Sequence, residues 1–311
     1  MEAEGKGPLL SIVVPCYNEA ACVGLFVQAV SQESLPVAVE FVFVDDGSTD
    51  ETLARIKALA MRDERVRWVS FSRNFGKEAA LLAGLRHSRG DYVVTMDVDL
   101  QDPPEKLPEM LSALREEGYD CVATRRVDRR GEPPVRSWFA RRFYWVMRHL
   151  SEVALVDGAR DYRLMTRQVV EAILALPECN RFTKGIYQWV GFQTKWIAFE
   201  NVERVTGESK WSFWRLFRYS LEGILSYSTA PLQLASLLGL LCCVGAFVAL
   251  MVVFFRALFF SDPVCGWPSL VCIIVFLGGL QLFVVGILGA YLAKTYLETK
   301  RRPLYLVREA H

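Results

Sequence analysis

Short runs of mostly apolar residues recur along the first part of the chain, and each predicts a buried strand. They span residues 9–14, 39–44, 67–71, 92–96 and 121–124. The segments between them carry apolar residues at helical spacing, as Val23, Phe26, Val27 and Val30 do after the first run. Strands that are apolar throughout and alternate with helices are typical of a mostly parallel sheet with helices on both faces. The pattern therefore predicts an α/β fold.

Polar clusters follow four of the predicted strands, at residues 15–19, 45–46, 72–74 and 97–101. The carboxyl ends of parallel strands share one edge of a sheet, and ligands bind beyond that edge. We therefore expect a nucleotide site there, with Asp45 or Asp46 accepting hydrogen bonds from a base or from ribose hydroxyls. The sequence has no glycine-rich phosphate loop, so a metal ion would have to hold the phosphates.

Residues 93–102 are the stretch around which this site is organised. Side chains alternate faces along a strand, so Asp97 and Asp99 are expected to project to one side of its end. Two neighbouring carboxylates, with the Gln101 amide, suit Mg²⁺ or Mn²⁺. The alternative is a pair of solvated turn aspartates before a helix. Ser48 and Glu51 stand at capping-box spacing, so for Ser48 we favour helix capping, whereas for Asp46 we favour ligand contact.

Two long uncharged stretches, residues 232–255 and 267–293, each exceed the ~20 residues needed to cross a bilayer. The short connection Ser261-Asp262-Pro263 has no Lys or Arg, whereas Lys300, Arg301 and Arg302 follow the second stretch. The positive-inside rule then puts both chain ends in the cytoplasm. The acidic N-terminus and the short first apolar run lack the form of a signal peptide, so we expect the leading domain to stay in the cytoplasm.

Two further stretches suit a membrane surface. Residues 133–150 and 212–226 each combine an apolar stripe with arginines beside it; for the first, a solvated basic helix packed on the sheet is the alternative. The expected organisation is a catalytic domain (1–207), an amphipathic juxtamembrane helix (208–229), two transmembrane helices (230–260 and 264–296) and a cytoplasmic tail (297–311).

Composition narrows the classes of function. Lys and Arg number 36 against 35 Asp and Glu, giving a net charge of +1 that favours no nucleic-acid partner. The eight cysteines contain no Cys-x-x-Cys pair, and the chain has three histidines. This spacing indicates neither zinc nor a disulfide framework, and it fits reduced cysteines in a cytosol-facing protein.

Four motifs in order carry a family resemblance. They are Val14-Pro15-Cys16-Tyr17-Asn18-Glu19, Val44-Asp45-Asp46-Gly47-Ser48-Thr49-Asp50, Arg73-Asn74-Phe75-Gly76-Lys77 and Asp97-Val98-Asp99-Leu100-Gln101-Asp102. The chain resembles the family-2 inverting glycosyltransferases of the GT-A fold, a Rossmann-like α/β fold. Within them it is similar to the polyprenyl-phosphate glycosyltransferases, which include bactoprenol glucosyltransferases and dolichol-phosphate mannose synthases.

The resemblance implies roles for residues of these motifs. It implies a base and ribose site at Pro15, Tyr17, Glu19 and Asp46, to which we add Lys77 and Asp97 as nucleotide-binding residues. It also implies a metal, Mg²⁺ or Mn²⁺, at Asp97 and Asp99 with help from Gln101.

The acceptor side of the site is expected from residues 157–165, which resemble the family's segment beside the reacting centre. Asp161 and Arg163 match that segment, with Asp157 as an offset alternative, and Asp161, Asp99 and Arg163 are the expected catalytic residues. Whether Asp161 acts as a base or only orients groups stays open. Arg125 suits a lipid phosphate because a guanidinium binds phosphate bidentately. Arg204, Ser209 and Lys210 suit diphosphate oxygens, or else form surface salt bridges.

The expected reaction is transfer of a sugar, glucose from UDP-glucose before other UDP- or GDP-sugars, to a polyprenyl phosphate in the plasma (inner) membrane for cell-envelope glycosylation. A tetramer is expected from relatives. A processive polysaccharide synthase is less favoured because a Gln-x-x-Arg-Trp-like segment and further spans are missing. Two more hypotheses are a non-catalytic membrane scaffold and a nucleotidyltransferase with a membrane anchor.

Overall fold

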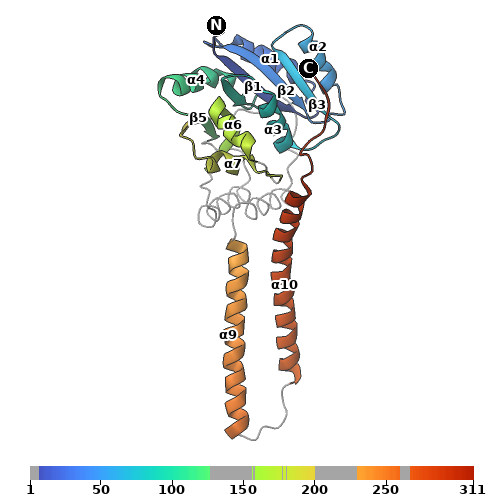
Figure 1. Ribbon diagram of the computed structural model, residues 1–311, viewed down its shortest axis with the longest axis vertical. Coiled ribbons are helices and arrows are strands. Elements are labelled where there is room, and N and C mark those ends of the chain that lie inside the picture. Colours follow the sequence, from blue (N-terminus) through green and yellow to red (C-terminus); the bar gives the residue numbers. More distant parts are fainter. Residues whose placement is uncertain are drawn as a thin grey trace.

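The computed structural model describes residues 7–126, 156, 158–176, 178–179, 181–199, 230–259 and 267–311. Within these residues eight strands form one sheet in the order β7-β5-β6-β4-β1-β2-β3-β8 (Figure 1). The strands are β1 Leu9–Cys16, β2 Ala38–Asp45, β3 Val66–Phe71, β4 Tyr92–Thr95, β5 Cys121–Arg126, β6 Ala159–Thr166, β7 Thr194–Phe199 and β8 Val307–Ala310. The helices of the domain are α1 Val23–Gln32, α2 Thr52–Ala60, α3 Lys77–His87, the 3₁₀ turn η1 Pro104–Lys106, α4 Leu107–Glu116, α6 Arg167–Ala175 and α7 Thr183–Trp189.

The α/β fold and the five strands expected from the apolar runs are confirmed. β1 pairs in parallel with β2 and with β4, and β2 pairs in parallel with β3. Their carboxyl ends therefore lie at one edge of the sheet, where the polar clusters were expected to meet.

Strand β6 was not expected as a strand, and it lies inside the sheet, antiparallel to both β4 and β5. Its sequence carries Arg160, Asp161 and Arg163, so charge hides the apolar pattern of a central strand. Tyr162 and Leu164 are nonetheless fully buried on one of its faces. This strand brings the predicted acceptor segment next to the strand that leads to Asp97.

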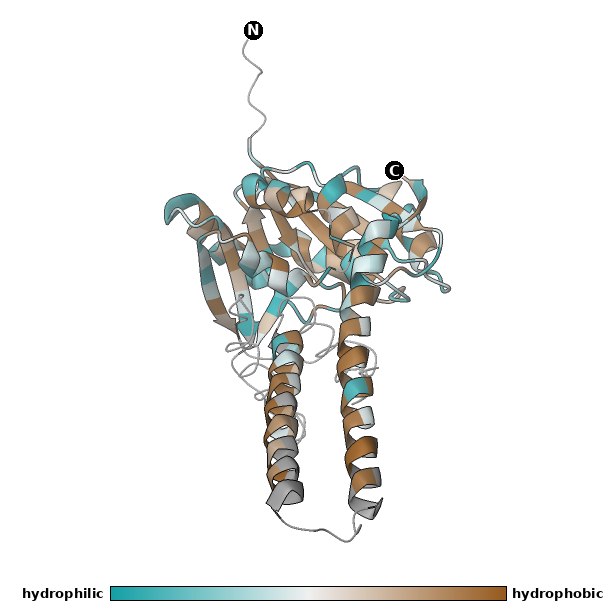
Figure 2. Cartoon of the chain, turned by 60° about the horizontal axis from the view of Figure 1, so that its bottom comes forward, coloured by the Kyte–Doolittle hydropathy of each residue, from teal (hydrophilic) through white to brown (hydrophobic). Residues whose placement is uncertain are grey.

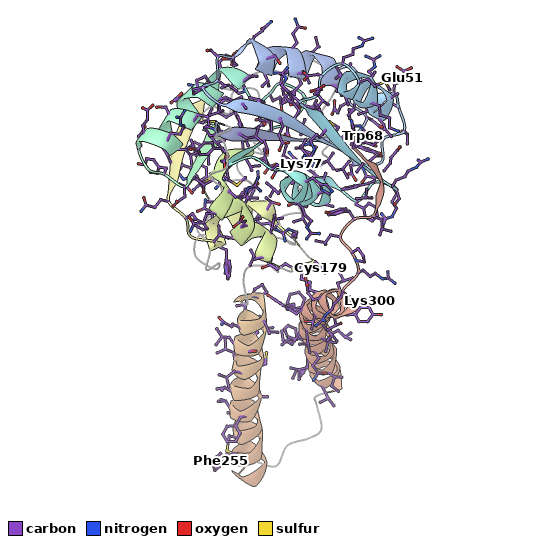
Figure 3. All side chains as sticks on the ribbon, turned by 45° about the horizontal axis from the view of Figure 1, so that its top comes forward. Glu51, Trp68, Lys77, Cys179, Phe255 and Lys300 are labelled. Carbon is purple, nitrogen blue, oxygen red and sulfur yellow. The ribbon has the colours of Figure 1, made fainter. Side chains whose placement is uncertain are left out.

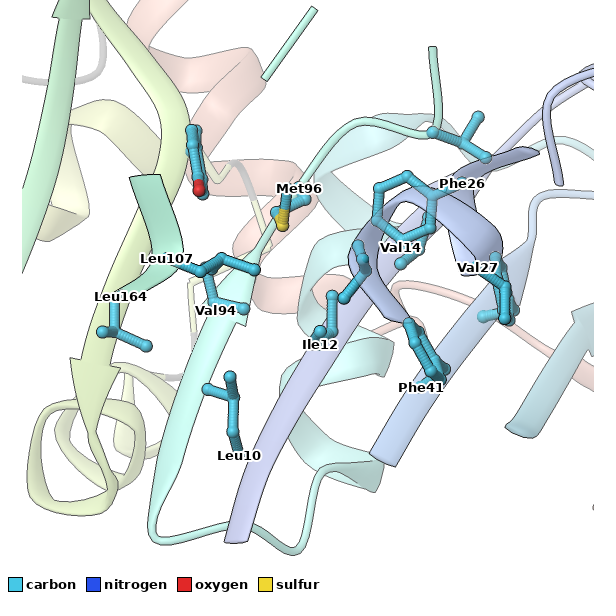
Figure 4. Close-up of a cluster of buried hydrophobic side chains, with 14 of the residues drawn as sticks. Leu10, Ile12, Val14, Phe26, Val27, Phe41, Val94, Met96, Leu107 and Leu164 are labelled. Atoms are coloured by element: carbon cyan, nitrogen blue, oxygen red, sulfur yellow. The ribbon is translucent and has the colours of Figure 1, made fainter. Parts of the chain in front are cut away.

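Helices cover both faces of the sheet. Phe26 of α1 packs edge-on against Phe41 of β2, at 6.5 Å between ring centroids, in a core that also includes Ile12 and residues of α2 and α4 (Figure 4). Val13 points to the opposite face, where α3, α6 and α7 pack. Because successive residues of β1 are buried on opposite faces, an uninterrupted apolar run is what this strand needs.

Helix α3 lies unusually close to the sheet at Gly84. A Cβ at this position would stand 2.1 Å from Val13 Cγ1, so the backbone of α3 approaches β1 only because residue 84 has no side chain. This close packing fixes the axis of the helix whose first residue is Lys77.

Two long helices leave the domain side by side (Figure 1). They are α9, Ala230–Phe259, and α10, Trp267–Lys300. At 1.5 Å per residue they extend roughly 45 and 51 Å, and residues 231–248 and 276–300 are apolar and long enough to cross a membrane. Figure 2 shows hydrophobic residues along both helices, with hydrophilic residues gathered on the domain surface.

The end of the chain differs from the expected tail. Helix α10 continues to Lys300, past the expected boundary at 296, and residues 307–310 then form β8, antiparallel to β3. Tyr305 stacks on Phe71, with 4.9 Å between ring centroids. The interpretation of residues 297–311 as a tail is therefore corrected: residues 297–300 belong to α10, and residues 307–310 pair with β3 and so cover the edge of the sheet.

Several predictions fall outside the described residues. These are the amphipathic stretches at 133–150 and 208–229, together with Asp157, Arg204, Ser209 and Lys210.

Candidate active site

The loops after β1 and β2 are joined by Asn18. Its N–H donates to Ser48 Oγ at 3.0 Å, and its Oδ1 accepts the Thr49 N–H at 2.8 Å. Ser48 therefore does not cap a helix: α2 begins at Thr52, whose N–H donates to Asp50 Oδ1 at 2.9 Å. The capping-box interpretation was wrong because loop-to-loop bonding uses the Ser48 hydroxyl instead.

The predicted base and ribose residues lie on this pair of loops. Tyr17 is 41% exposed, and Pro15 and Glu19 are partly exposed. All three stand where β1 ends, at the edge of the sheet on which the polar clusters converge. Their contact with a nucleotide stays a prediction, to which the structure adds an accessible tyrosine ring.

Asp46 is buried and holds the loop after β3. One carboxylate oxygen accepts the Phe75 N–H at 2.6 Å and the other accepts the Gly76 N–H at 2.9 Å. Gly47 allows this closure because its φ is +65° and a Cβ would stand 2.4 Å from the Arg73 carbonyl carbon. Asp46 thus fixes the backbone that leads into α3. Its contact with the nucleotide stays a prediction.

Asp97 and Asp99 lie in a tight turn after β4, which ends at Thr95. The Asp97 N–H donates to Asp102 Oδ2 at 3.0 Å, the Gln101 N–H donates to Asp99 Oδ1 at 3.1 Å, and Leu100 has a φ of +59°. Strand alternation therefore does not position the two carboxylates, contrary to the expectation. Asp97 is partly exposed, and Asp99 is 8% exposed.

Lys77 joins Asp97 to Asp161. Its Nζ lies 2.7 Å from Asp97 Oδ1, 2.9 Å from Asp97 Oδ2 and 2.8 Å from Asp161 Oδ2. Figure 3 labels Lys77 at the start of α3. The surrounding protein would lower the pKa of the Lys77 ammonium, but Asp161 and Asp97 outweigh this effect and raise the pKa well above its ordinary value.

Asp161 lies among cations. Burial would raise the pKa of Asp161, but Lys77 and Lys184 outweigh it and hold the pKa well below its usual range. Lys184 Nζ donates to the Ala159 carbonyl at 3.0 Å. The main chain of Asp161 is fixed as well, because the Thr95 hydroxyl donates to its carbonyl oxygen.

Arg160 and Arg125 extend this cationic region. The Arg160 guanidinium lies 3.2 Å from Asp102 Oδ1 and 3.5 Å from Gln101 Oε1. Burial raises the pKa of Asp102 to about 6, helped by the Asp97 charge and opposed by Arg160. Arg125 is exposed, and its position in β5 is opposite Ala159 of β6. The structure therefore brings Arg125 near the Ala159–Lys184 contact.

Arg163 is not presented to the acceptor side. It is 2% exposed, its guanidinium lies 4.3 Å from the Tyr187 ring centroid and 5.3 Å from that of Trp196, and its NH1 donates to Cys121 Sγ. Arg163 therefore packs α7 against β6, and its burial argues against a direct contact with the acceptor phosphate.

The donors at the turn fit a divalent ion of the hard type. Across the described parts of the chain no three His, Cys, Asp or Glu side chains gather as a metal site. A metal here would be held by the Asp97 and Asp99 carboxylates with help from the Gln101 amide oxygen, and would complete its shell with water and phosphate oxygens. Magnesium sites built from one or two carboxylates and substrate phosphates have this form.

Sequence reasoning missed Arg160, Lys184 and Glu78. The Glu78 carboxylate accepts the Thr183 N–H at 3.0 Å as well as the Thr183 hydroxyl, which ties α7 to α3. Lys184 is the second residue of α7, and a lysine near the start of a helix has no local signal for its function. Its placement depends on the pairing of β6 with β5, which no local pattern reveals.

Comparisons with known proteins show the family of the chain. Residues 11–174 match glycosyl transferase family 2. The chain is 43% identical over 304 residues to the SfII prophage-derived bactoprenol glucosyl transferase of Shigella flexneri, covering 97% of this chain and 98% of that protein. It is 42% identical over 308 residues to a Bacillus subtilis (strain 168) protein named as the glycosyltransferase CsbB, covering 98% of this chain and 93% of that protein.

A solved structure shares the fold. Glucosyl-3-phosphoglycerate synthase from Mycobacterium tuberculosis, in complex with Mn²⁺, uridine diphosphate and phosphoglyceric acid, has a TM-score of 0.50 at 20% identity and covers 70% of this chain and 77% of that one. The family match over more than half of the chain, and relatives above 40% identity over nearly all of it, show that the chain belongs to glycosyl transferase family 2.

Proposed function

We propose that this protein transfers glucose from UDP-glucose to a polyprenyl phosphate at a membrane surface, with inversion at the sugar carbon. The observation that carries the proposal is the pairing of Asp97 and Asp161 through Lys77, with the cations Arg160 and Lys184 near Asp161. Arg125 pairs with Ala159 in the same sheet. Family membership supports sugar transfer, the names of the relatives support glucose and bactoprenol, and helices α9 and α10 support a lipid acceptor.

The donor is proposed to bind over the loops after β1, β2 and β3. Tyr17 offers an exposed ring for a base, and Pro15 and Glu19 flank it. Asp46 shapes the third loop through Phe75 and Gly76. The diphosphate then extends toward Lys77 and the turn at Asp97.

The proposed metal ligands are Asp97, Asp99 and Gln101, for Mg²⁺ or Mn²⁺. When bound, the ion neutralises charge that develops on the departing diphosphate. Lys77 adds a cation at the same place, and Arg204, Ser209 and Lys210 are proposed to contact diphosphate oxygens.

The acceptor phosphate is an anion near neutral pH, so it needs positioning more than it needs a strong base. Arg125 and Lys184 are the cations proposed to bind it, with Arg125 the more exposed. The low pKa of Asp161, held down by Lys77 and Lys184 against the effect of burial, makes this carboxylate a weak base. We therefore assign Asp161 an orienting role toward Lys77. In a single displacement the phosphate oxygen forms the new bond to the sugar carbon as the nucleoside diphosphate leaves.

The membrane arrangement is part of the proposal. Both ends of the chain and the catalytic domain face the cytoplasm, and helices α9 and α10 cross the plasma (inner) membrane. We also propose that the protein assembles with further copies of itself, as a tetramer, and that the product serves cell-envelope glycosylation.

The test uses membranes containing the full chain and a panel of radiolabelled UDP- and GDP-sugars with Mn²⁺. Label from UDP-glucose should enter an organic-extractable lipid, and EDTA should stop this transfer. Asp99→Asn should lower the rate by at least about a hundredfold, because it removes a charged ligand from the metal that stabilises the leaving group, while membrane integration is unchanged. Transfer from another sugar alone would replace glucose in the proposal, and an unchanged rate in Asp99→Asn would reject the metal site.

A further inference from the structure

The Lys77 ammonium uses the same carboxylate oxygens that a metal at Asp97 would need. Three N–H donors of the ammonium face three oxygens, two from Asp97 and one from Asp161, at 2.7–2.9 Å. An ammonium has three donors, so this arrangement satisfies all of them. Both oxygens of Asp97 are occupied by one cation that belongs to the protein.

With the Lys77 ammonium 2.7 and 2.9 Å from the two Asp97 oxygens, a divalent ion bound to the same carboxylate would be strongly repelled by the ammonium. Like charges about 4 Å apart repel each other far more in a partly buried site than in bulk water. Asp97 and Asp161 are both only partly exposed. A metal that binds Asp97 must therefore displace Lys77 from it.

Lys77 has room to move and a reason to do so. Its side chain is 43% exposed, and its main chain is held at the start of α3 by Asp46, which fixes Gly76, and by the neighbouring Glu78, which binds Thr183. Four methylene groups on a fixed backbone allow the ammonium to swing while the helix stays in place. A diphosphate at the metal would offer the Lys77 ammonium new oxygen partners. The nucleotide would therefore offset the loss of the ion pair between Lys77 and Asp97.

We propose that Lys77 is an internal competitor of the metal, which makes binding of the divalent ion at Asp97 depend on the diphosphate of the nucleotide. Without the nucleotide, Lys77 keeps Asp97 and the metal binds weakly. With it, Lys77 moves from Asp97 to the diphosphate and the metal binds tightly. Because such coupling is reciprocal, the metal raises nucleotide affinity by the same factor. The inference rests on the proposed metal and nucleotide site, and it deepens that proposal by assigning the order of events there.

The test is Mn²⁺ binding to the purified full-length protein in detergent, followed by the electron paramagnetic resonance signal of free Mn²⁺, with and without UDP. Lys77→Met should bind Mn²⁺ alone about tenfold more tightly than the unaltered protein, since a close positive charge is removed. UDP should strengthen Mn²⁺ binding strongly in the unaltered protein and much less in Lys77→Met.

Two matched variants separate competition from a general charge effect. Lys184→Met removes an ammonium whose charge also acts on Asp161. This ammonium donates a hydrogen bond to the Ala159 carbonyl and not to Asp97. Lys195→Met removes a charge on β7 that pairs with Glu117. Both should change Mn²⁺ binding by less than about twofold, because neither ammonium lies on the carboxylate that would take the metal.

The outcomes are distinct. Tighter Mn²⁺ binding confined to Lys77→Met, with reduced coupling to UDP, supports the competition. An equal gain in Lys184→Met, or unchanged binding and coupling in Lys77→Met, overturns it while leaving the glucosyl transfer reaction intact. If the unaltered protein binds no Mn²⁺ even with UDP, the proposed metal site itself fails.

Discussion

Glu298, near the end of α10, accepts the backbone N–H of Cys179 at 2.9 and 3.0 Å through its two carboxylate oxygens. Cys179 lies between α6 and α7, and Figure 3 shows it close to Lys300 where the long helix meets the domain. Helix α7 begins four residues later and carries Thr183 and Lys184, which bind Glu78 and the Ala159 carbonyl. A helix long and apolar enough to cross a membrane is thus linked through one short segment to a cation of the candidate site.

Glu298→Ala should weaken this link. Loss of a hydrogen bond to a charged group is expected to cost about 1.5–3 kcal/mol of stability, and a displaced α7 should raise the KM for the lipid acceptor more than it lowers kcat. Thermal melting in detergent and initial rates at varied acceptor concentration measure both effects. Glu51→Ala is the control, because Glu51 forms an exposed i,i+4 pair with Arg55 on α2. Equal melting temperatures for Glu298→Ala and Glu51→Ala would contradict the structural link.

The two sides of the site differ in how far the sequence predicts them. Tyr17, Asp46 and Asp97 follow apolar runs directly, and parallel strands put such positions at one edge, so their neighbourhood follows from local pattern and topology. Lys77 and Asp161 are 84 residues apart by number, and they meet only because β6 inserts beside β4. Charged residues in β6 conceal its strand pattern, so the ion pair at the centre of the site has no signal in either segment alone.

The same reasoning explains the errors. Ser48 has the spacing of a helix cap, yet a partner thirty residues away, Asn18, takes its hydroxyl. Arg163 has the chemistry of a phosphate ligand, yet Tyr187 and Trp196 enclose it. A local pattern indicates what a side chain is able to bind. Which partner it binds in the folded protein depends on residues that the tertiary fold brings next to it.

Glu78→Gln should change how stability depends on pH. Burial raises the pKa of Glu78, and the Thr183 hydrogen bonds oppose this only in part. A raised pKa means that the folded protein holds the proton more tightly than the unfolded chain. The stabilising contribution is therefore full below the unfolded pKa, about 4.3, and is lost as pH rises through the folded pKa.

Glutamine keeps an oxygen for Thr183 and does not ionise. As the pH rises above the unfolded pKa of about 4.3, the melting temperature of Glu78→Gln should therefore increase relative to that of the unaltered protein. Thr183→Val removes the hydroxyl that lowers the pKa of Glu78, so it should move the loss of stability to higher pH. Melting curves in one detergent across this range test both variants, and a temperature difference independent of pH would argue against a raised pKa.

Gly47→Ala should destabilise the domain. The residue has a φ of +65°, and a Cβ would stand 2.4 Å from the backbone of Arg73 and 2.7 Å from that of Asn74. Both contacts are with backbone atoms, which cannot rotate away as a side chain could. A strained backbone of this kind costs of order 1–3 kcal/mol before the clash is counted. Gly24→Ala on α1 is the matched control: no atom lies within 4 Å of its Cβ, and the exchange should stabilise the helix by roughly 0.8–1 kcal/mol. Opposite shifts in the midpoint of chemical unfolding are expected, and shifts of the same sign would show that the turn tolerates a side chain.

Removal of residues 304–311 should destabilise the sheet at β3. The deletion removes β8 and the stacking of Tyr305 on Phe71, and with them the ion pair in which Lys57 Nζ lies 2.7 Å from Glu309 Oε2. It leaves the backbone N–H and C=O groups of β3 unpaired at an edge, which is a template for association with another chain. The shortened protein should melt at a lower temperature and aggregate with increasing concentration, as light scattering would show. Arg308→Ala, an exposed change within β8, should behave like the unaltered protein because the strand still pairs. If the shortened protein instead stays dispersed and melts unchanged, β8 adds no stability, and the edge of β3 needs no cover.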